Sequence, residues 1–150
     1  VIARPANNYG PRQFTEKLIP KIVTTLMGRG KVPVYGDGEQ IRDWLYVKDT
    51  AQALWSLYER GERGQAYNLG AHEFRTVMEV IGEVAELMNL DRNEHVTYVT
   101  DRIRGDRRYA LSLSKTTQMG WSSSTPFSKG LSETVKWYHT SYDNSGRRIF

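Results

Sequence analysis

Segments with the apolar pattern of buried strands alternate along this chain with segments whose apolar residues recur at helical spacing. The clearest helical pattern runs from Thr76 to about Leu90, where Thr76 and Glu79 have the spacing of a capping box ahead of a one-sided apolar face. Strands are predicted at residues 1–3, 32–35, 41–47, 66–69 and 96–99, and helices at residues 19–26, 76–90 and 114–119, after Asp49 and from Ser128. This alternating order is typical of an α/β protein, and 150 residues are enough for one domain with a core.

Single residues are used to place two of these elements. Asp49 is a favourable N-cap, so it is predicted to begin a helix that carries Leu54, Leu57 and Tyr58. Trp44, in the strand at 41–47, is predicted to belong to the core rather than to a ligand site.

The first residues have the composition of a short buried strand, Val1 to Ala3, with no lead-in. A turn-forming cluster at residues 7–11 follows at the carboxyl end of this strand, the edge at which open α/β sheets bind ligands. We therefore expect the chain to start inside a sheet whose other strands lie upstream.

Composition excludes several classes of protein. The chain has no cysteine, so disulfides, thiolate metal sites and a cysteine nucleophile are excluded, and a cytoplasmic location is expected. No apolar run reaches the roughly 18 residues of a membrane span, so no membrane partner is expected. The net charge of +4 is compatible with a nucleic acid or a diphosphate ligand. Nucleic acid is the weaker prediction because the basic residues lack interleaved aromatic side chains.

The chain contains no visible catalytic machinery. It has no glycine-rich turn of the kind that lets backbone amides reach a dinucleotide pyrophosphate, and no tyrosine is followed four residues later by a lysine. His72, His95 and His139 are scattered without metal-ligand spacing. We therefore predict no catalytic residue and no metal ligand in this chain.

Several stretches, taken in order, resemble the extended short-chain dehydrogenases/reductases that act on nucleotide sugars. These stretches are NNYGP (7–11), EKLIP (16–20), VPVYGDGEQIRDWLYVKD (32–49), AYNLG (66–70), DRIRGDRRY (101–109) and MGW…PFSKGLSETVKWY (119–138). EKLIP, RDWLYV and the DRxxxDRRY loop are similar more narrowly to the dTDP-glucose 4,6-dehydratase family.

This resemblance implies that residues 1–150 are a carboxyl-terminal, substrate-binding part, including a strand or two of an incomplete Rossmann sheet. An NAD-binding half is expected upstream of residue 1, where it would supply the catalytic tyrosine, lysine and acidic pair. The implied reaction is that of a lyase: oxidation of the sugar at C4, loss of water across C5 and C6, and reduction at C6. The part alone is expected to be inactive, and the full-length protein is expected to be a homodimer.

The resemblance also implies roles for individual residues. Asn8 corresponds to a position beside the NAD cofactor. The positions that correspond to substrate contacts, for dTDP-glucose or a related nucleotide sugar, are Asn7, Lys17, Leu18, Pro33, Val34, Tyr35, Arg42, Asp101, Arg102, Arg104 and Gly105. A guanidinium such as that of Arg42 can hold two phosphate oxygens at once, although a local salt bridge to Asp43 is an alternative role.

The chain departs from the family pattern at three places. Gly105 stands where the family has a histidine, Arg104 adds a cation, and Val77 stands where a ligand-side asparagine is usual. Pro5 and Ala6 replace the usual cysteine and serine. Two alternatives therefore stay open: another nucleotide-sugar epimerase, decarboxylase or dehydratase of the same superfamily, and a non-catalytic binding module.

Overall fold

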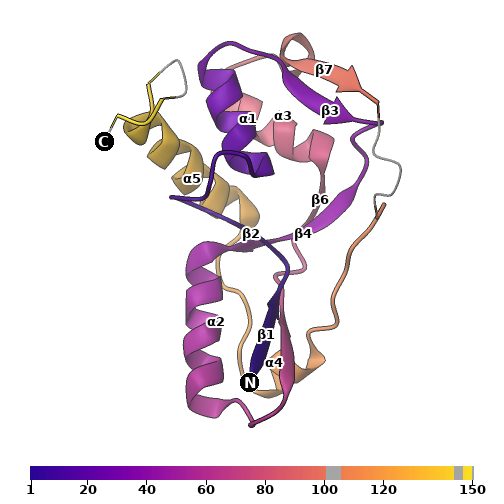
Figure 1. Ribbon diagram of the computed structural model, residues 1–150, viewed down its shortest axis with the longest axis vertical. Helices are drawn as coiled ribbons and strands as arrows, with labels where there is room; N and C mark the ends of the chain where they lie inside the picture. Colours follow the sequence, from indigo (N-terminus) through magenta and orange to yellow (C-terminus); the bar gives the residue numbers. More distant parts are fainter. Residues whose placement is uncertain (101–105, 144–146, 150) are drawn as a thin grey trace.

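The fold was established from a computed structural model, which describes residues 1–100, 106–143 and 147–149. Helices and strands alternate as predicted, and the α/β class is confirmed (Figure 1). In chain order the elements are β1 (Ile2–Pro5), β2 (Asn7–Tyr9), α1 (Leu18–Met27), β3 (Val32–Tyr35), β4 (Ile41–Tyr46), α2 (Val47–Arg60), β5 (Ala66–Leu69), β6 (Phe74–Thr76), α3 (Val77–Leu87), the 3-10 helix η1 (Arg92–His95), β7 (Val96–Val99), α4 (Ser114–Gln118) and α5 (Phe127–Ser141).

The strands form three small sheets in the described part of the chain. β1 pairs with β5 and β3 pairs with β7, both in parallel. β4 is the centre of the third sheet, parallel to β2 on one side and antiparallel to β6 on the other. Because β2 and β6 are far apart in sequence, β4 is the element that connects the first and the middle parts of the chain.

Two hydrophobic clusters lie on either side of β4. The larger one packs α1, α3 and α5 against β3 and β4, in the upper half of Figure 1. The smaller one packs α2 against β5, with Trp121 completing it, in the lower half of the same view. Successive side chains of a strand point to opposite faces, and β4 follows this rule: Trp44 and Tyr46 belong to the larger cluster and Leu45 to the smaller one.

Local sequence signals explain several boundaries. Thr76 caps α3 as predicted: its hydroxyl accepts from the Glu79 amide at 3.0 Å, and the Glu79 carboxylate accepts from the Thr76 amide at 2.7 Å. Pro20 lies in the first turn of α1, where a missing N–H breaks no helical hydrogen bond. α4 ends before Gly120, whose φ of +85° favours glycine.

The predicted cap of α2 was wrong. The helix begins at Val47, and Asp49 lies inside its first turn rather than at the cap. The helix carries Leu54, Leu57 and Tyr58 as predicted; Leu57 is buried, whereas Leu54 is 49% and Tyr58 79% exposed. The core side of α2 is instead formed by small and polar residues around Leu57.

The beginning of the chain also differs from the expectation. The predicted strand exists as β1, but Ile2 is 54% exposed, so it is not a buried strand here. The predicted turn at 7–11 is largely strand: β2 pairs with β4, and its Tyr9 is fully buried. In the described residues no helix has the length and apolar character needed to cross a membrane.

Candidate functional site

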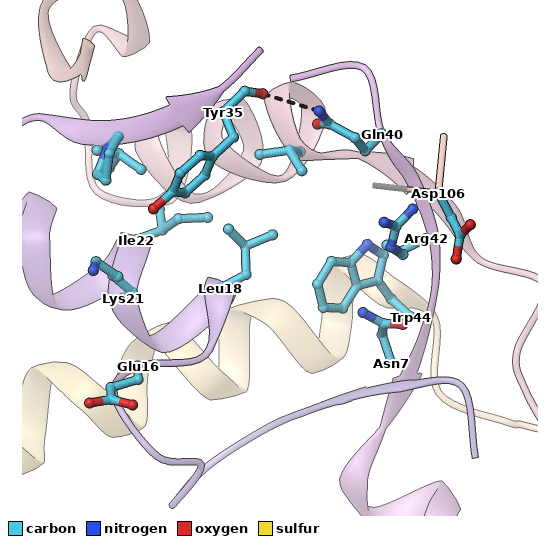
Figure 2. Close-up of a pocket in the computed structure, with 13 residues that line it drawn as sticks. Asn7, Glu16, Leu18, Lys21, Ile22, Tyr35, Gln40, Arg42, Trp44 and Asp106 are labelled. Atoms are coloured by element: carbon cyan, nitrogen blue, oxygen red, sulfur yellow. Dashed lines mark hydrogen bonds between the residues drawn. The ribbon is translucent and has the colours of Figure 1, made fainter. Parts of the chain in front are cut away.

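Two adjoining cavities lie where β2, α1, β3 and β4 meet. The larger has a volume of about 510 Å³ and the smaller about 300 Å³. Asn7, Leu18 and Trp44 line both, so these residues form the boundary between them. Figure 2 shows side chains from α1, β3 and β4 pointing into the larger cavity.

Most of the described residues with a predicted ligand role meet at these cavities. Asn7, Leu18, Pro33, Tyr35 and Arg42 line the larger one. The smaller cavity is lined by the following residues: Asn7, Asn8, Gln13, Lys17, Leu18 and Trp44. Val34 is the exception, because it is fully buried in the larger cluster and lines neither cavity.

Residues 101–105 are not among the described residues, so the predicted roles of Asp101, Arg102, Arg104 and Gly105 stay predictions. Both flanks of this segment adjoin the larger cavity. On one side, β7 ends at Val99, which pairs with Tyr35 of β3. On the other side, Asp106 lines the cavity, and Arg107 accepts a backbone hydrogen bond from Ile41 at 2.8 Å.

Tyr35 and Gln40 form the outer wall of the larger cavity. Tyr35 keeps 42% of its surface exposed, which leaves an aromatic side chain at the cavity. The Gln40 side-chain Nε2 donates to the Tyr35 carbonyl at 3.1 Å, so the two residues are held together (Figure 2). An aromatic wall of this kind can pack against a planar base.

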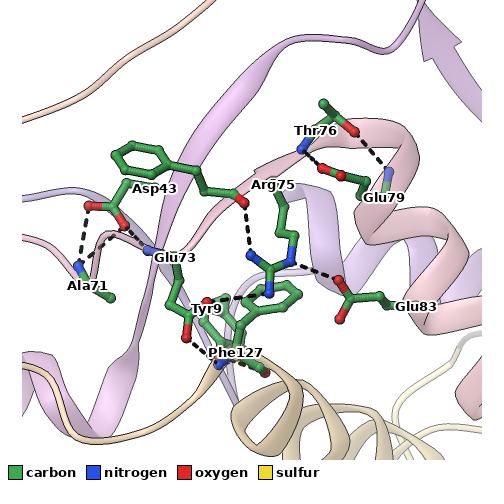
Figure 3. A network of polar contacts seen from close by, with 10 residues as sticks. Tyr9, Asp43, Ala71, Glu73, Arg75, Thr76, Glu79, Glu83 and Phe127 are labelled. Atoms are coloured by element: carbon green, nitrogen blue, oxygen red, sulfur yellow. Dashed lines mark hydrogen bonds and ion pairs between the residues drawn. The ribbon is translucent and has the colours of Figure 1, made fainter.

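Arg42 and Asp43 point to opposite sides of β4. The Asp43 carboxylate, 2% exposed, accepts from the backbone amides of Ala71 at 3.2 Å and Glu73 at 3.0 Å (Figure 3). Arg42 Nη1 donates to the neighbouring Ile41 carbonyl at 2.7 Å, and Arg42 has no ion pair within the described ranges. The alternative of a local Arg42–Asp43 salt bridge is therefore not realised, and the guanidinium keeps donors for a ligand.

The two neighbouring asparagines differ in how their side chains are used. Asn8 Nδ2 donates to the Ala6 carbonyl at 3.0 Å, and its Oδ1 accepts from the Thr50 hydroxyl. The Asn7 side chain is exposed and has no hydrogen bond to any described residue. Asn8 is thus held by the protein, whereas Asn7 can reach a ligand in either cavity.

Lys17 and Lys21 bring further positive charge to α1. Lys17 lines the smaller cavity and Lys21 the larger one, and neither has an ion pair among the residues described. Glu16 and Asp106 also line the larger cavity, so its rim carries both signs of charge. Within the described ranges no group of three His, Cys, Asp or Glu side chains is placed to hold a metal ion.

Sequence reasoning gave no ligand role to eight residues that line the cavities: Gln13, Glu16, Lys21, Ile22, Val32, Gln40, Trp44 and Asp106. For Trp44 alone, the sequence held a signal that could have indicated a position at the ligand site. Residues two apart on a strand share a face, so a ligand role for Arg42 brings Trp44 to the same side. The core prediction for Trp44 is nonetheless confirmed, because the side chain is 4% exposed and belongs to the larger cluster.

The chain is similar to known proteins over most of its length. Residues 1–70 match the model of the NAD dependent epimerase/dehydratase family. The chain is 38% identical over 145 residues to a dTDP-glucose 4,6-dehydratase of Escherichia coli, with 92% of this chain and 40% of that protein covered. It is 40% identical to the same enzyme of Neisseria gonorrhoeae, with 99% of this chain and 45% of the relative covered.

Solved structures give the same result. The crystal structure of dTDP-glucose 4,6-dehydratase from Bacillus anthracis in complex with NAD superposes with a TM-score of 0.86 at 40% identity, over 92% of this chain and 44% of that one. The chain spans less than half the length of these relatives. By sequence and by fold, the chain is therefore a homologue of the dTDP-glucose 4,6-dehydratases that corresponds to less than half of their length.

Proposed function

We propose that this chain is the nucleotide-sugar-binding part of a dTDP-glucose 4,6-dehydratase. The observation that carries the proposal is the meeting of Asn7, Tyr35 and Arg42 at one cavity, in a homologue of these enzymes. Tyr35 offers a face for the base, Arg42 offers donors for the diphosphate, and Asn7 lies where the larger cavity joins the smaller one.

The two cavities suggest how the ligand is oriented. The base would lie in the larger cavity between α1 and β3, with the diphosphate near Arg42. The sugar would then extend past Asn7 and Trp44 toward the smaller cavity, which Asn8 and Lys17 also line. In this proposal the chain binds and orients the substrate, and its polar side chains make no covalent bond.

NAD is the cofactor that this family implies, and bound NAD would accept and return the hydride of the proposed reaction. In the described residues Asn8 is the one candidate contact for it, held in place by Ala6 and Thr50. The chain has neither a glycine-rich dinucleotide turn nor a tyrosine–lysine pair at four-residue spacing. We therefore propose that NAD is bound mainly by a separate half of the full-length protein and that this chain alone has no dehydratase activity.

Three further statements belong to the same proposal. The full-length protein would be a lyase, a homodimer and cytoplasmic. The departures at Val77 and Gly105 keep a related nucleotide-sugar enzyme as the second candidate. Val77 does line the larger cavity, which makes it a position where the substrate could differ.

The test is calorimetric titration of the full-length protein with dTDP-glucose, glucose 1-phosphate and glucose. The proposal expects dTDP-glucose to bind at least 100-fold more tightly than glucose 1-phosphate, because the base and second phosphate supply most contacts. Product analysis then separates the candidates: a 4-keto-6-deoxy sugar supports the dehydratase, and a 4-epimer supports the second candidate. Equal, weak binding of all three ligands would reject the nucleotide-sugar site.

A further inference from the structure

Trp44 carries a buried hydrogen-bond donor that has no acceptor. The side chain is 4% exposed, and its indole Nε1 is the one buried side-chain nitrogen or oxygen without a partner in the described part of the chain. A buried N–H without an acceptor destabilises the folded state. Such a group calls for an explanation, and a functional role is one of the recognised explanations.

The position of Trp44 points to the ligand site. It lies two residues after Arg42 on β4 and so faces the same side of the strand. Asn7 is its register partner on the neighbouring strand β2. All three residues line the larger cavity (Figure 2), and Trp44 and Asn7 also line the smaller one.

The indole ring is fixed by its neighbours. Tyr9 packs edge-on against it with ring centroids 6.2 Å apart, and Phe127 lies with its centroid at 6.3 Å. Both partners are 1% exposed. The ring therefore cannot turn away to find an acceptor without disturbing the larger cluster.

The two polar side chains that share the cavity wall with Trp44, Arg42 and Asn7, both carry N–H donors. Arg42 has a guanidinium that is turned back onto its own strand, to the Ile41 carbonyl. Asn7 has an amide with no hydrogen bond to a described residue. The unpartnered indole N–H, the remaining guanidinium N–H groups and the Asn7 amide N–H are together complementary to a ligand rich in acceptors and negatively charged, which is the chemistry of a phosphate group.

We propose that the Trp44 indole N–H donates a hydrogen bond to the diphosphate of the bound nucleotide sugar, alongside Arg42. This inference rests on the proposed function of the site. It requires a local side-chain rearrangement that exposes the buried indole nitrogen when the ligand enters, and it requires Arg42 to turn from the Ile41 carbonyl toward the ligand. Trp44 is then a ligand-contacting residue as well as a core residue.

The test is the change Trp44→Phe in the full-length protein, which keeps an aromatic ring and removes the N–H. The dissociation constant of dTDP should rise about 10-fold, in the range of hydrogen bonds to charged groups. That of thymidine, which has no phosphate, should be unchanged. The melting temperature without ligand reports separately the loss of ring volume in the larger cluster.

Trp121→Phe is the matched control. Trp121 is 8% exposed and belongs to the smaller cluster, away from both cavities. This variant should leave the dissociation constants of dTDP and thymidine unchanged. If wild-type protein binds neither ligand, the proposed function itself fails.

Two outcomes would overturn the inference while leaving the proposed function intact. One is an unchanged dTDP affinity in Trp44→Phe, and the other is an equal loss for dTDP and thymidine, which would indicate ring packing. Should the variant not fold, the wild-type protein gives the same answer by nitrogen-15 NMR of the indole groups. The Trp44 resonance, assigned with phenylalanine variants of the other tryptophans of the full-length protein, should move downfield with dTDP and not with thymidine; an unmoved resonance overturns the proposal.

Discussion

The two faces of β4 use polar residues in opposite ways. On one face Asp43 is buried and accepts hydrogen bonds from the amides of Ala71 and Glu73. On the other face Arg42 reaches only its neighbour's carbonyl, and the Trp44 indole N–H has no partner among the described residues. Three consecutive residues thus divide into a structural carboxylate and two donors for which we propose a ligand. A charged pair in sequence is therefore no evidence of a salt bridge when it lies on a strand.

The buried carboxylates of Asp43 and Asp49 both accept hydrogen bonds from the backbone amides of loops. Asp49, 2% exposed, accepts from the backbone amides and hydroxyls of Ser124 and Thr125, at 2.9 to 3.3 Å. Asp43 does the same for the turn at Ala71. A Cβ added at the neighbouring Gly70 would lie only 2.4 Å from an Asp43 carboxylate oxygen. Each carboxylate fixes a loop that no regular secondary structure holds.

The largest expected effect is a loss of stability at high pH. It tests whether three tyrosines of the larger cluster must keep their hydroxyls protonated for the cluster to be stable. Burial raises the pKa of Tyr9, Tyr46 and Tyr138 above the usual value of about 10. A group with a raised pKa in the folded state stabilises the fold fully below the unfolded pKa, and this contribution is lost as pH rises from about 10 toward the folded pKa. We expect the free energy of unfolding to fall above pH 10 by up to about 1.4 kcal/mol per pH unit for each tyrosine.

Urea unfolding at pH 9, 10 and 11 measures this dependence. Tyr9→Phe removes the Tyr9 share while leaving its ring in place, so the decline between pH 10 and 11 should become about a third smaller. An identical decline in the variant would mean that Tyr9 does not contribute.

The next largest effect tests the structural face of β4. Asp43→Ala leaves the amides of Ala71 and Glu73 without their buried acceptor. We expect a loss of about 3 kcal/mol in the free energy of unfolding, measured by urea titration. Asp43→Asn keeps one carbonyl oxygen and should lose about half as much. A loss below about 1 kcal/mol in the alanine variant would break the comparison, because Asp43 would then not differ from a surface residue.

The third effect tests the opposite face. Arg42→Ala should weaken binding of dTDP-glucose by about 2 kcal/mol, roughly 30-fold, and change the free energy of unfolding by less than about 0.5 kcal/mol. Arg42→Lys should recover only part of the affinity, because an ammonium lacks the planar fork. Calorimetry and urea titration of the same samples measure both quantities. A variant that lost stability and kept its affinity would place Arg42 on the structural side.

The smallest expected effect is a control: it changes stability near the site without removing a residue that lines it. Thr76→Ala removes the side-chain half of the capping box of α3 and should cost about 1 kcal/mol in unfolding free energy. Thr76 is the register partner of Ile41, one residue before Arg42, so it lies close to the ligand site in the sheet without lining it. Affinity for dTDP-glucose should therefore not change. A loss of affinity would show that destabilisation near the site is enough to disturb it, and the Arg42 result would have to be corrected for that.

How well the sequence predicted each feature depends on how local its cause is. The capping box of α3 and the strand β3 follow from neighbouring residues and were predicted correctly. β2 was missed because its three residues become a strand only by pairing with β4, some 37 residues later in the sequence. Asp49 fits the N-cap pattern, but distant hydroxyls at Ser124 and Thr125 determine its real role.

For the candidate site, too, the sequence did not predict features that depend on contacts in three dimensions. Arg42 and Asn7 were assigned by resemblance, and the structure brings them to one cavity. The unpartnered state of the Trp44 nitrogen could not be read from the sequence, because it depends on the absence of an acceptor in three dimensions. The orientation of α2 is a comparable case: Leu54 and Tyr58 recur at helical spacing, but this pattern does not indicate that Leu57, rather than these two residues, faces the core.

The strict alternation along β4 has a consequence for how the chain can tolerate changes in length. The turn before it contains Gly36 and Gly38, both at positive φ, and sets the phase with which the strand enters the sheet. If an added residue in that turn shifts β4 by one position against β2, the guanidinium turns toward the buried loop and the carboxylate toward the cavity. A shift by two positions keeps every side chain on its own face. Insertions that move the register of β4 should thus be governed by parity, with even shifts tolerated and odd shifts excluded.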